Sequence, residues 1–297
     1  LEQRDSQLWE TPASSLADTV LTPMLENDWL EGVDPLYLVP HDMLNYLPFA
    51  LLPTHSAIEN ERVIDRFSLA YLPSAETLAN AISNGDQPQS MLAMAPGNSR
   101  LQNAADEVSS IAYMFRPHSE ILLGADATES AFKDSAGQYR VLHLATHGFF
   151  NSLNPLLSGL QLEPDGANDG LLEVHEILEL DLETDLVTLS ACETGLGSGF
   201  FTEIPAGDAF VGMTRSFLQA GSATVLATLW AVDDRSTLDL MKSFYRDLGT
   251  SGVNKSKAAA LANAQRCIRS TEKYQHPYFW APFVLVGAMN QQNRNRG

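Results

Sequence analysis

The chain has 297 residues, of which 44% are hydrophobic, and a formal net charge of −19. This length can fill a large core in one domain or in two fused halves. The charge disfavours binding to nucleic-acid phosphates, and no apolar run approaches the roughly 20 residues that cross a bilayer, so we expect neither nucleic acid nor membrane as a partner. Two cysteines are too few for a disulfide framework and are typical of a reducing cytosol.

The two ends of the chain and its metal-binding potential give three further expectations. The chain begins with Leu1-Glu2-Gln3, without an initiator methionine, and we interpret it as a domain of a longer polypeptide. It has no CxxC pair of the kind that holds a structural zinc ion, so we expect no bound metal and no cofactor. Residues 291–297 are polar and are expected to form a frayed tail.

Residues 1–87 predict the short elements of a non-catalytic N-terminal subdomain. The expected elements are a helix over 13–28 that Pro23 interrupts, strands over 36–40 and 67–72, a packed turn over 43–52, and a helix that Ser74 caps. The stretch 84–89 is polar, contains Gly and Pro, and predicts a linker. We therefore expect the subdomain to end near residue 87.

Residues 88–290 alternate between strand and helix patterns. The expected strands cover 90–95, 120–123, 141–147, 186–190, 223–230 and 283–287, the expected helices cover 104–115, 174–178, 206–220, 236–248 and 256–268, Thr128 caps a further helix, and 159–162 with 170–172 form a hairpin. Apolar strands alternating with helices favour a mostly parallel sheet that is covered on both faces. The sequence thus predicts an α/β fold.

Two of these strands lead to residues with reactive side chains. The first delivers His147, which Gly148 follows at once, and the second is followed by Cys192. In an open α/β sheet, residues just past the carboxyl ends of strands line the crevice where ligands bind. A cysteine attacks an amide carbonyl as the thiolate and needs a neighbouring imidazole to take its proton. We therefore expect His147 as the base and Cys192 as the nucleophile.

Gly148 predicts an oxyanion site. A glycine lets the backbone approach a substrate closely, and its N–H can act together with that of Cys192 on the developing negative charge. Each such donor contributes about 3–4 kcal/mol in related acyl-transfer chemistry. A side chain at position 148 is therefore expected to lower activity.

The remaining histidines and the second cysteine are interpreted as structural. His143 shares a strand with His147 and is expected in the core, and Cys267 is expected to be a small buried residue on a helix face. The other five have no nucleophile nearby in the sequence and are assigned to structural or surface positions; they are His41, His55, His118, His175 and His276.

Acidic residues are concentrated around the two strands. Between Arg140 and Arg215 there is no Lys or Arg, whereas Asp and Glu recur throughout the interval. One interpretation is a solvated acidic face, and the other is an electrostatic field that attracts a basic substrate segment. Negative charge near Cys192 also disfavours its thiolate, while a protonated His147 favours it.

Several motifs together resemble one family. They are Leu38-Val39-Pro40, Ala70-Tyr71-Leu72-Pro73-Ser74, Ala145-Thr146-His147-Gly148, Leu189-Ser190-Ala191-Cys192-Glu193-Thr194-Gly195, Gly207-Asp208, Leu229-Trp230-Ala231-Val232-Asp233-Asp234 and Trp280-Ala281-Pro282-Phe283. This set is similar to the CHAT domain, a branch of the caspase and separase clan of cysteine peptidases that usually follows tetratricopeptide repeats. The likeness extends roughly from Leu36 to Gly287.

The resemblance implies a caspase-like sheet with an N-terminal, pseudo-caspase-like packing subdomain. It implies that His147 and Cys192 form the dyad, that Gly148 helps to form the oxyanion hole, and that the spacing of the two catalytic residues is that of caspases. Many relatives cut after Arg or Lys with an acidic pocket, for which Asp234, Asp233 and Asp208 are the counterparts here. A pocket for an Asp side chain would instead need a basic residue, such as Arg215 or Arg235.

Three functions from different classes stay open. The first is a cysteine endopeptidase that cleaves a specific protein and is gated by a partner, by upstream repeats or by a cation such as Ca²⁺. The second is a catalytically quiet regulatory or interaction module, and the third is a thiol hydrolase or acyl transferase with the same dyad. Trp9 and Trp29 either contact neighbouring repeats or are buried within the chain.

Overall fold

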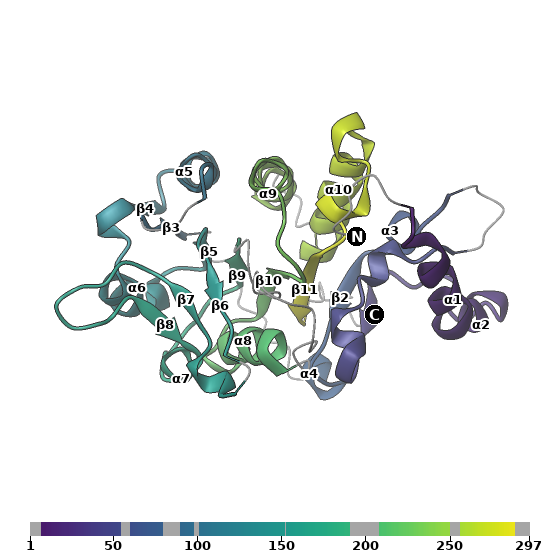
Figure 1. Ribbon diagram of the computed structural model, residues 1–297, viewed down its shortest axis with the longest axis horizontal. Helices are drawn as coiled ribbons and strands as arrows, with labels where there is room; N and C mark the ends of the chain where they lie inside the picture. Colours follow the sequence, from purple (N-terminus) through teal and green to yellow (C-terminus); the bar gives the residue numbers. More distant parts are fainter. Residues whose placement is uncertain are drawn as a thin grey trace, which may run out of the picture.

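The computed structural model of the chain describes residues 7–54, 60–79, 90–97, 101–151, 153–190, 208–249 and 256–288. Within these ranges an eight-stranded sheet has the strand order β1-β2-β11-β10-β9-β5-β3-β4 (Figure 1). The bounds are β1 Leu36–Leu38, β2 Leu69–Tyr71, β3 Met91–Ala95, β4 Ser119–Leu123, β5 Val141–Leu144, β9 Leu186–Leu189, β10 Thr224–Thr228 and β11 Phe283–Gly287. Neighbouring strands are parallel except β10 with β11. The predicted mostly parallel α/β sheet is confirmed.

Helices cover the sheet on both sides, as Figure 1 shows. One face carries α5 Ala104–Met114, α9 Asp234–Gly249 and α10 Lys257–Ser270, and the other carries α6 Glu129–Ser135, α7 Val174–Ile177 and α8 Asp208–Gln219. Side chains of β3 alternate between the two cores: Met91 and Ala93 belong to the first, and Leu92 and Met94 to the second. Because helices cover both faces, the strands are apolar at nearly every position.

Shorter elements complete the described chain. The helices are α1 Glu10–Val20, α2 Thr22–Glu26, α3 Val63–Arg66 and α4 Glu76–Ala79, and the 3-10 helices are η1 Asp42–Tyr46, η2 Phe49–Leu51, η3 Gly124–Asp126, η4 Ala136–Gln138, η5 Pro155–Leu157, η6 Glu272–Tyr274 and η7 Pro277–Phe279. The expected interruption of the first helix occurs at Leu21, between α1 and α2, because Pro23 is tolerated in the first turn of α2. Thr128 caps α6 as predicted, since its Oγ1 accepts a hydrogen bond from Ala131 N.

A second, smaller sheet lies beside the carboxyl end of β5. It consists of β6 Gly148–Phe149, β7 Gly159–Gln161 and β8 Leu171–Glu173, and its strands are antiparallel. The predicted hairpin is thus confirmed as β7 and β8. The expected strand over 141–147 is shorter than predicted, because β5 ends at Leu144 and the chain turns before it enters β6.

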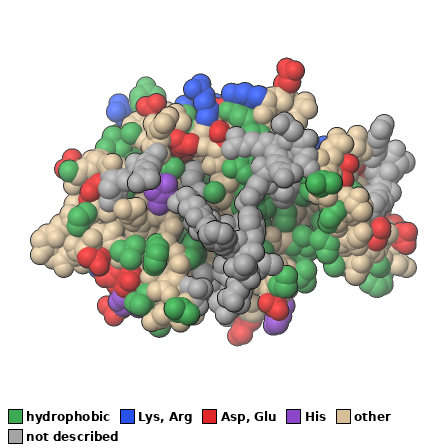
Figure 2. Space-filling view, in the orientation of Figure 1, with side chains coloured by type: hydrophobic (Ala, Val, Ile, Leu, Met, Phe, Trp, Pro, Cys, Tyr) green, Lys and Arg blue, Asp and Glu red, His purple; other side chains and the backbone are tan. Residues whose placement is uncertain are grey.

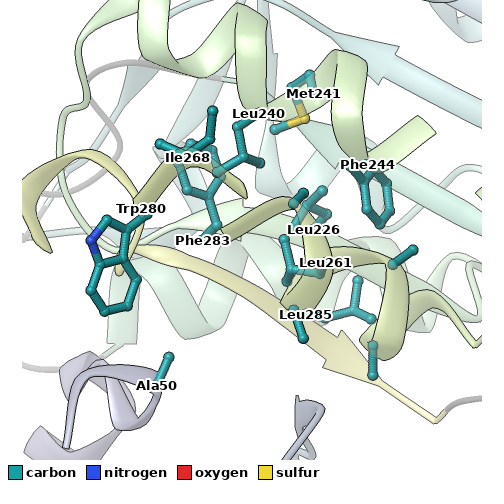
Figure 3. Close-up of a cluster of buried hydrophobic side chains, with 14 of the residues drawn as sticks. Ala50, Leu226, Leu240, Met241, Phe244, Leu261, Ile268, Trp280, Phe283 and Leu285 are labelled. Carbon is teal, nitrogen blue, oxygen red and sulfur yellow. The ribbon is translucent and has the colours of Figure 1, made fainter. Parts of the chain in front are cut away.

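The N-terminal residues share the sheet and the core of the rest of the chain. Strand β2 pairs with β11, and Arg269 of α10 makes two hydrogen bonds of 2.9 and 2.8 Å with the carboxylate of Asp65. In Figure 3, Ala50 of η2 faces Trp280 in the cluster that also holds Phe283 and Leu285. The boundary expected at residue 87 and the tail over 291–297 lie outside the described residues and stay predictions.

Cys267 is not buried as expected, and of the two alternatives for Trp9 and Trp29 the burial of both is excluded. Cys267 is exposed, because the buried face of α10 carries Leu261, Ala264 and Ile268, and residue 267 is about 100° around the helix from residue 268. Trp29 is 69% exposed, while Trp9 is partly buried with the guanidinium of Arg62 over its ring, so the two tryptophans are not both buried. In the described part of the chain, no helix has the length and apolar character that crossing a bilayer requires.

Candidate functional site

The two strands that lead to the proposed dyad are neighbours in the main sheet. Strands β5 and β9 are parallel, with Leu144 opposite Leu189, and Ser190 N donates a hydrogen bond of 2.9 Å to Leu144 O. Their carboxyl ends therefore lie side by side at one edge of the sheet, between β3 and β10. This is the edge at which ligands bind in open α/β sheets.

His147 lies three residues beyond the end of β5, in the turn that leads into β6. Its carbonyl oxygen accepts a hydrogen bond of 2.8 Å from Gln161 N, and the buried Thr146 hydroxyl donates to Gln161 O. Hydrogen bonds from the two consecutive residues Thr146 and His147 therefore hold this turn against β7. The side chain of His147 is half-buried.

Gly148 begins β6 and lies opposite Leu160 of β7. This pairing fixes the backbone that follows His147, which is the arrangement that a preorganised N–H donor needs. Cys192 lies outside the described residues, and the strand that precedes it is described as far as Ser190. The approach of His147 to Cys192 and the oxyanion role of Gly148 therefore stay predictions.

The candidate pocket carboxylates have partners within the chain. Asp233 caps α9, since its Oδ1 accepts a hydrogen bond of 3.1 Å from Ser236 N. Asp234 Oδ2 accepts hydrogen bonds from the backbone N and from Nδ2 of Asn103, at 2.7 and 2.9 Å, and Asn103 directly precedes α5. These two aspartates thus hold the N-termini of the helices α9 and α5 at the carboxyl edge of the sheet. Asp208 begins α8, and its side chain lies outside the described part.

Much of the acidity between residues 140 and 215 is used inside the fold. Asp185 accepts two hydrogen bonds from the guanidinium of Arg140, at 2.7 and 3.0 Å. Backbone hydrogen bonds from Ala167 and Ser130 lower the pKa of Asp165 well below its usual range. The visible Lys and Arg side chains gather along the upper margin of the face in Figure 2, above α5 and α9. Within the interval that lacks Lys and Arg, the charge of Asp185 is therefore neutralised by Arg140 at its boundary.

A second cluster neutralises a buried acid near the small sheet. Lys133 of α6 donates hydrogen bonds to Glu129, Asn168 and Glu176, at 2.5, 2.9 and 2.7 Å. Glu129 is 1% exposed, and its second oxygen accepts from Gly170 N at 2.9 Å. These bonds connect α6, α7 and the β7–β8 turn. They favour a structural role for the two glutamates and not an electrostatic role toward a substrate.

A group of buried polar residues lies beneath the two strand ends, and no motif in the sequence had indicated it. His143, which had been assigned to the core, contacts Glu107 and Tyr245, and Tyr245 in turn contacts Thr188. The available signal was Glu107 itself, an acidic residue on the otherwise apolar face of α5. Among the described residues, no group of three or more His, Cys, Asp or Glu side chains is arranged to hold a metal ion.

The sheet order, the helices on both faces and the strand-end histidine define a caspase-like α/β domain. Residues 10–288 match the family model described as CHAT domain. The chain therefore belongs to the CHAT domain family, as its motifs had indicated.

Two curated relatives and two kinds of solved structure are similar to the chain. Tetratricopeptide repeat protein 28 is 28% identical in Homo sapiens and 25% in Mus musculus, in both cases over 97% of this chain but only 13% and 14% of the relative. A Saccharomyces cerevisiae separase–securin complex matches 82% of this chain and 15% of the other, with 15% identity and a TM-score of 0.53. The Arg-specific cysteine proteinase gingipain R matches 80% and 57%, with 9% identity and a TM-score of 0.52.

Proposed function

We propose that the chain is a cysteine endopeptidase domain with His147 as the base and Cys192 as the nucleophile. The observation that carries the proposal is the register of β5 and β9, which are adjacent and parallel, so that their carboxyl ends lie at the same edge. In the sequence, His147 and Cys192 follow these two ends. Membership of the CHAT family and a fold shared with separase and gingipain R support this assignment. The whole protein's activity is part of the same proposal, because the chain spans a small fraction of its curated relatives.

In this mechanism, the imidazole of His147 takes the thiol proton of Cys192, and the thiolate attacks the carbonyl carbon of the scissile peptide bond. The backbone N–H groups of Gly148 and Cys192 stabilise the tetrahedral oxyanion. His147 then donates the proton to the leaving amine, which leaves an acyl-enzyme. A water molecule that His147 deprotonates hydrolyses the thioester and restores the thiol.

The acidic residues at the site favour a substrate with a basic residue before the cut. A carboxylate has about four lone-pair positions, so Asp234 can accept an arginine guanidinium while it holds Asn103. Asp233 and Asp208 are the neighbouring candidates. The chemistry requires no metal ion.

Access to the site is proposed to be gated by a partner protein, by tetratricopeptide repeats upstream in a longer chain or by Ca²⁺. The curated relatives that cover this chain are tetratricopeptide repeat proteins, which supports the repeats. The exposed Trp29 is a candidate contact for them. Full activity of the isolated domain without any additive would contradict the gating.

Labelling with a peptidyl-arginine acyloxymethyl ketone tests the dyad. We expect one label per chain, lost in Cys192→Ala and slowed at least about 100-fold in His147→Ala, since the base generates the thiolate. Cys267→Ala is the matched control, because Cys267 is the exposed second cysteine, and it should label like the wild type. Absence of labelling with and without Ca²⁺ or repeats would favour the catalytically quiet module.

Sequencing the new amino ends from a peptide library tests the pocket. Asp234→Ala removes both the charge and the acceptor for Asn103, so it also disturbs α5. Asp234→Asn keeps an oxygen that accepts from Asn103 N and removes the charge. Weaker preference for Arg in Asp234→Asn, with an unchanged melting temperature, would support the pocket. Unchanged preference would remove Asp234 from it.

A further inference from the structure

Four polar side chains form a continuous hydrogen-bonded network beneath the proposed site. His143 Nε2 lies 2.9 Å from Glu107 Oε1, and His143 Nδ1 lies 3.1 Å from the Tyr245 hydroxyl, which in turn lies 2.7 Å from Thr188 Oγ1. All four residues are at most 1% exposed. They come from α5, β5, β9 and α9, so the network joins two central strands to the two helices that cover them.

The two strand residues of the network lie opposite each other in the sheet, and each precedes a proposed catalytic residue by the same number of positions. His143 and Thr188 are register partners in β5 and β9. His147 is four residues after His143, and Cys192 is four residues after Thr188. At the carboxyl edge, the bonds between Asp234 and Asn103 connect the starts of α9 and α5. The strands that lead to the site are thus bonded to the two helices through the network, and the two helices are bonded to each other at the carboxyl edge.

Stability alone does not explain the network. Desolvating a carboxylate and an imidazole costs several kcal/mol, which their attraction only partly returns, and apolar side chains of similar volume often stabilise a core as well or better. Neighbouring positions of the same core are apolar, since Tyr245 packs edge-on against Phe115 and Phe244 with ring centroids 5.7 and 5.1 Å apart. What directed hydrogen bonds add to such a core is a unique relative position of the groups that they join.

The four side chains can stay hydrogen-bonded to one another whether the imidazole of His143 is neutral or charged. Burial raises the pKa of the Tyr245 hydroxyl, which therefore keeps its proton. When the imidazole is neutral, its Nε2–H donates to Glu107, Tyr245 donates to Nδ1, and Thr188 donates to Tyr245. When the imidazole is charged, Nδ1–H donates to Tyr245, and Tyr245 donates to Thr188.

We propose that Glu107, His143, Thr188 and Tyr245 are positioning residues that fix the ends of β5 and β9 in the relative placement that the dyad needs. This inference rests on the proposed peptidase function. The Tyr245 hydroxyl is its central atom, because it is the atom through which β5, β9 and α9 are joined.

Removing single oxygen atoms tests the proposal in a Cys267→Ala background, in which Cys192 is the remaining cysteine. In Tyr245→Phe and Thr188→Val, we expect the alkylation of Cys192 by iodoacetamide at pH 7 to be at least about tenfold slower. The kcat on an Arg peptide should fall by at least about the same factor, while KM stays within about twofold of the wild type. Thr188→Ser keeps the hydroxyl and should retain the wild-type rates.

Tyr71→Phe is the matched control for the loss of a buried hydroxyl. Tyr71 is fully buried in β2, donates to Leu47 O at 2.7 Å and accepts from Phe49 N at 3.2 Å. The Tyr71→Phe variant should show the same decrease in melting temperature as Tyr245→Phe, while its alkylation rate and kcat stay within about twofold of the wild type. Equal rates in Tyr71→Phe and Tyr245→Phe would overturn the positioning role.

Hydrogen exchange separates this proposal from the peptidase proposal. In Tyr245→Phe, the amides of residues 144–148 should exchange at least about tenfold faster than in the wild type, while those of β2 should not change. Faster exchange in a chain that neither cleaves nor labels would support the network and contradict the peptidase. Unchanged exchange in a wild type that does cleave would contradict the network alone.

Discussion

Among the described residues, Lys257 is the clearest case of a charged side chain in an unfavourable electrostatic environment. It is the first residue of α10, where the helix N-terminus disfavours a cation. Burial and, secondarily, repulsion from Arg140 lower its pKa to about 8, although Asp185 acts in the opposite direction. The protonated side chain therefore weakens the folded state at neutral pH.

This lysine predicts a stability that rises with pH. The pKa of an unfolded lysine is about 10.4, so between pH 8 and 10 the unfolded chain keeps a proton that the folded chain has lost, and the free energy of unfolding increases. We expect Lys257→Met to abolish this increase and to stabilise the fold at pH 7 by about 1–2 kcal/mol. Urea unfolding at pH 7 and 9.5 measures both effects.

Lys273→Met is the control for this measurement. Lys273 is exposed in η6, and its removal should change the free energy of unfolding by less than about 0.5 kcal/mol at either pH. The comparison stays below pH 10, because burial also raises the pKa of Tyr71, whose stabilising protonation is lost at still higher pH. A wild type whose stability is flat from pH 8 to 10 would contradict the assignment.

At the scale of elements, the end of α8 fixes how this helix enters β10. Ser222 N donates to Phe217 O at 3.0 Å and Gly221 N donates to Leu218 O at 3.2 Å, which is the Schellman arrangement. Gly221 has a φ of +112°, and a Cβ placed there would lie 1.9 Å from Leu182 O. Only glycine fits this turn, and the turn sets the start of the strand beside β9.

Gly221→Ala is therefore expected to destabilise the chain by more than about 3 kcal/mol, since backbone must move in addition to adopting an unfavourable φ. Gly212→Ala is the opposite control in the same helix, because nothing lies within 4 Å of the added Cβ and alanine favours a helix by about 1 kcal/mol over glycine. Thermal unfolding of both variants measures this difference, and the melting temperature should fall in Gly221→Ala and not in Gly212→Ala. Similar melting temperatures would refute the steric argument.

At the scale of the molecule, the described residues up to 79 share the main sheet and the core with the rest of the described chain. Strand β2 pairs with β11, and the core around Trp280 contains side chains from both parts. The expected non-catalytic subdomain is thus joined to the proposed catalytic one by backbone hydrogen bonds, by apolar contacts and by the Asp65–Arg269 ion pair.

We predict that a chain shortened to residues 90–297 does not fold cooperatively. It would expose the edge of β11 and the apolar groups that α1, η2 and α3 cover, and such an edge promotes aggregation. Size-exclusion chromatography and thermal unfolding of the shortened chain test this. A monomeric product with the full-length melting temperature would show that the two parts are independent.

The sequence by itself determined the alternation of strands and helices, the α/β class and the two strand ends that carry His147 and Cys192. These features depend on local patterns, since buried parallel strands are apolar throughout, Thr128 begins a helix through its own hydroxyl, and Gly221 ends one through its positive φ. The family motifs indicate the same elements, because the motifs lie at the ends of the strands.

Tertiary structure alone decided which side chains meet across distant elements. The partners of Asp234 and His143 are 131 and 102 residues away at Asn103 and Tyr245, and no local pattern encodes such contacts. Exposure of Cys267 likewise depended on which face of α10 packs against the rest of the chain. The order of the strands, which brings β9 beside β5, decides whether a histidine and a cysteine far apart in sequence can act as a pair.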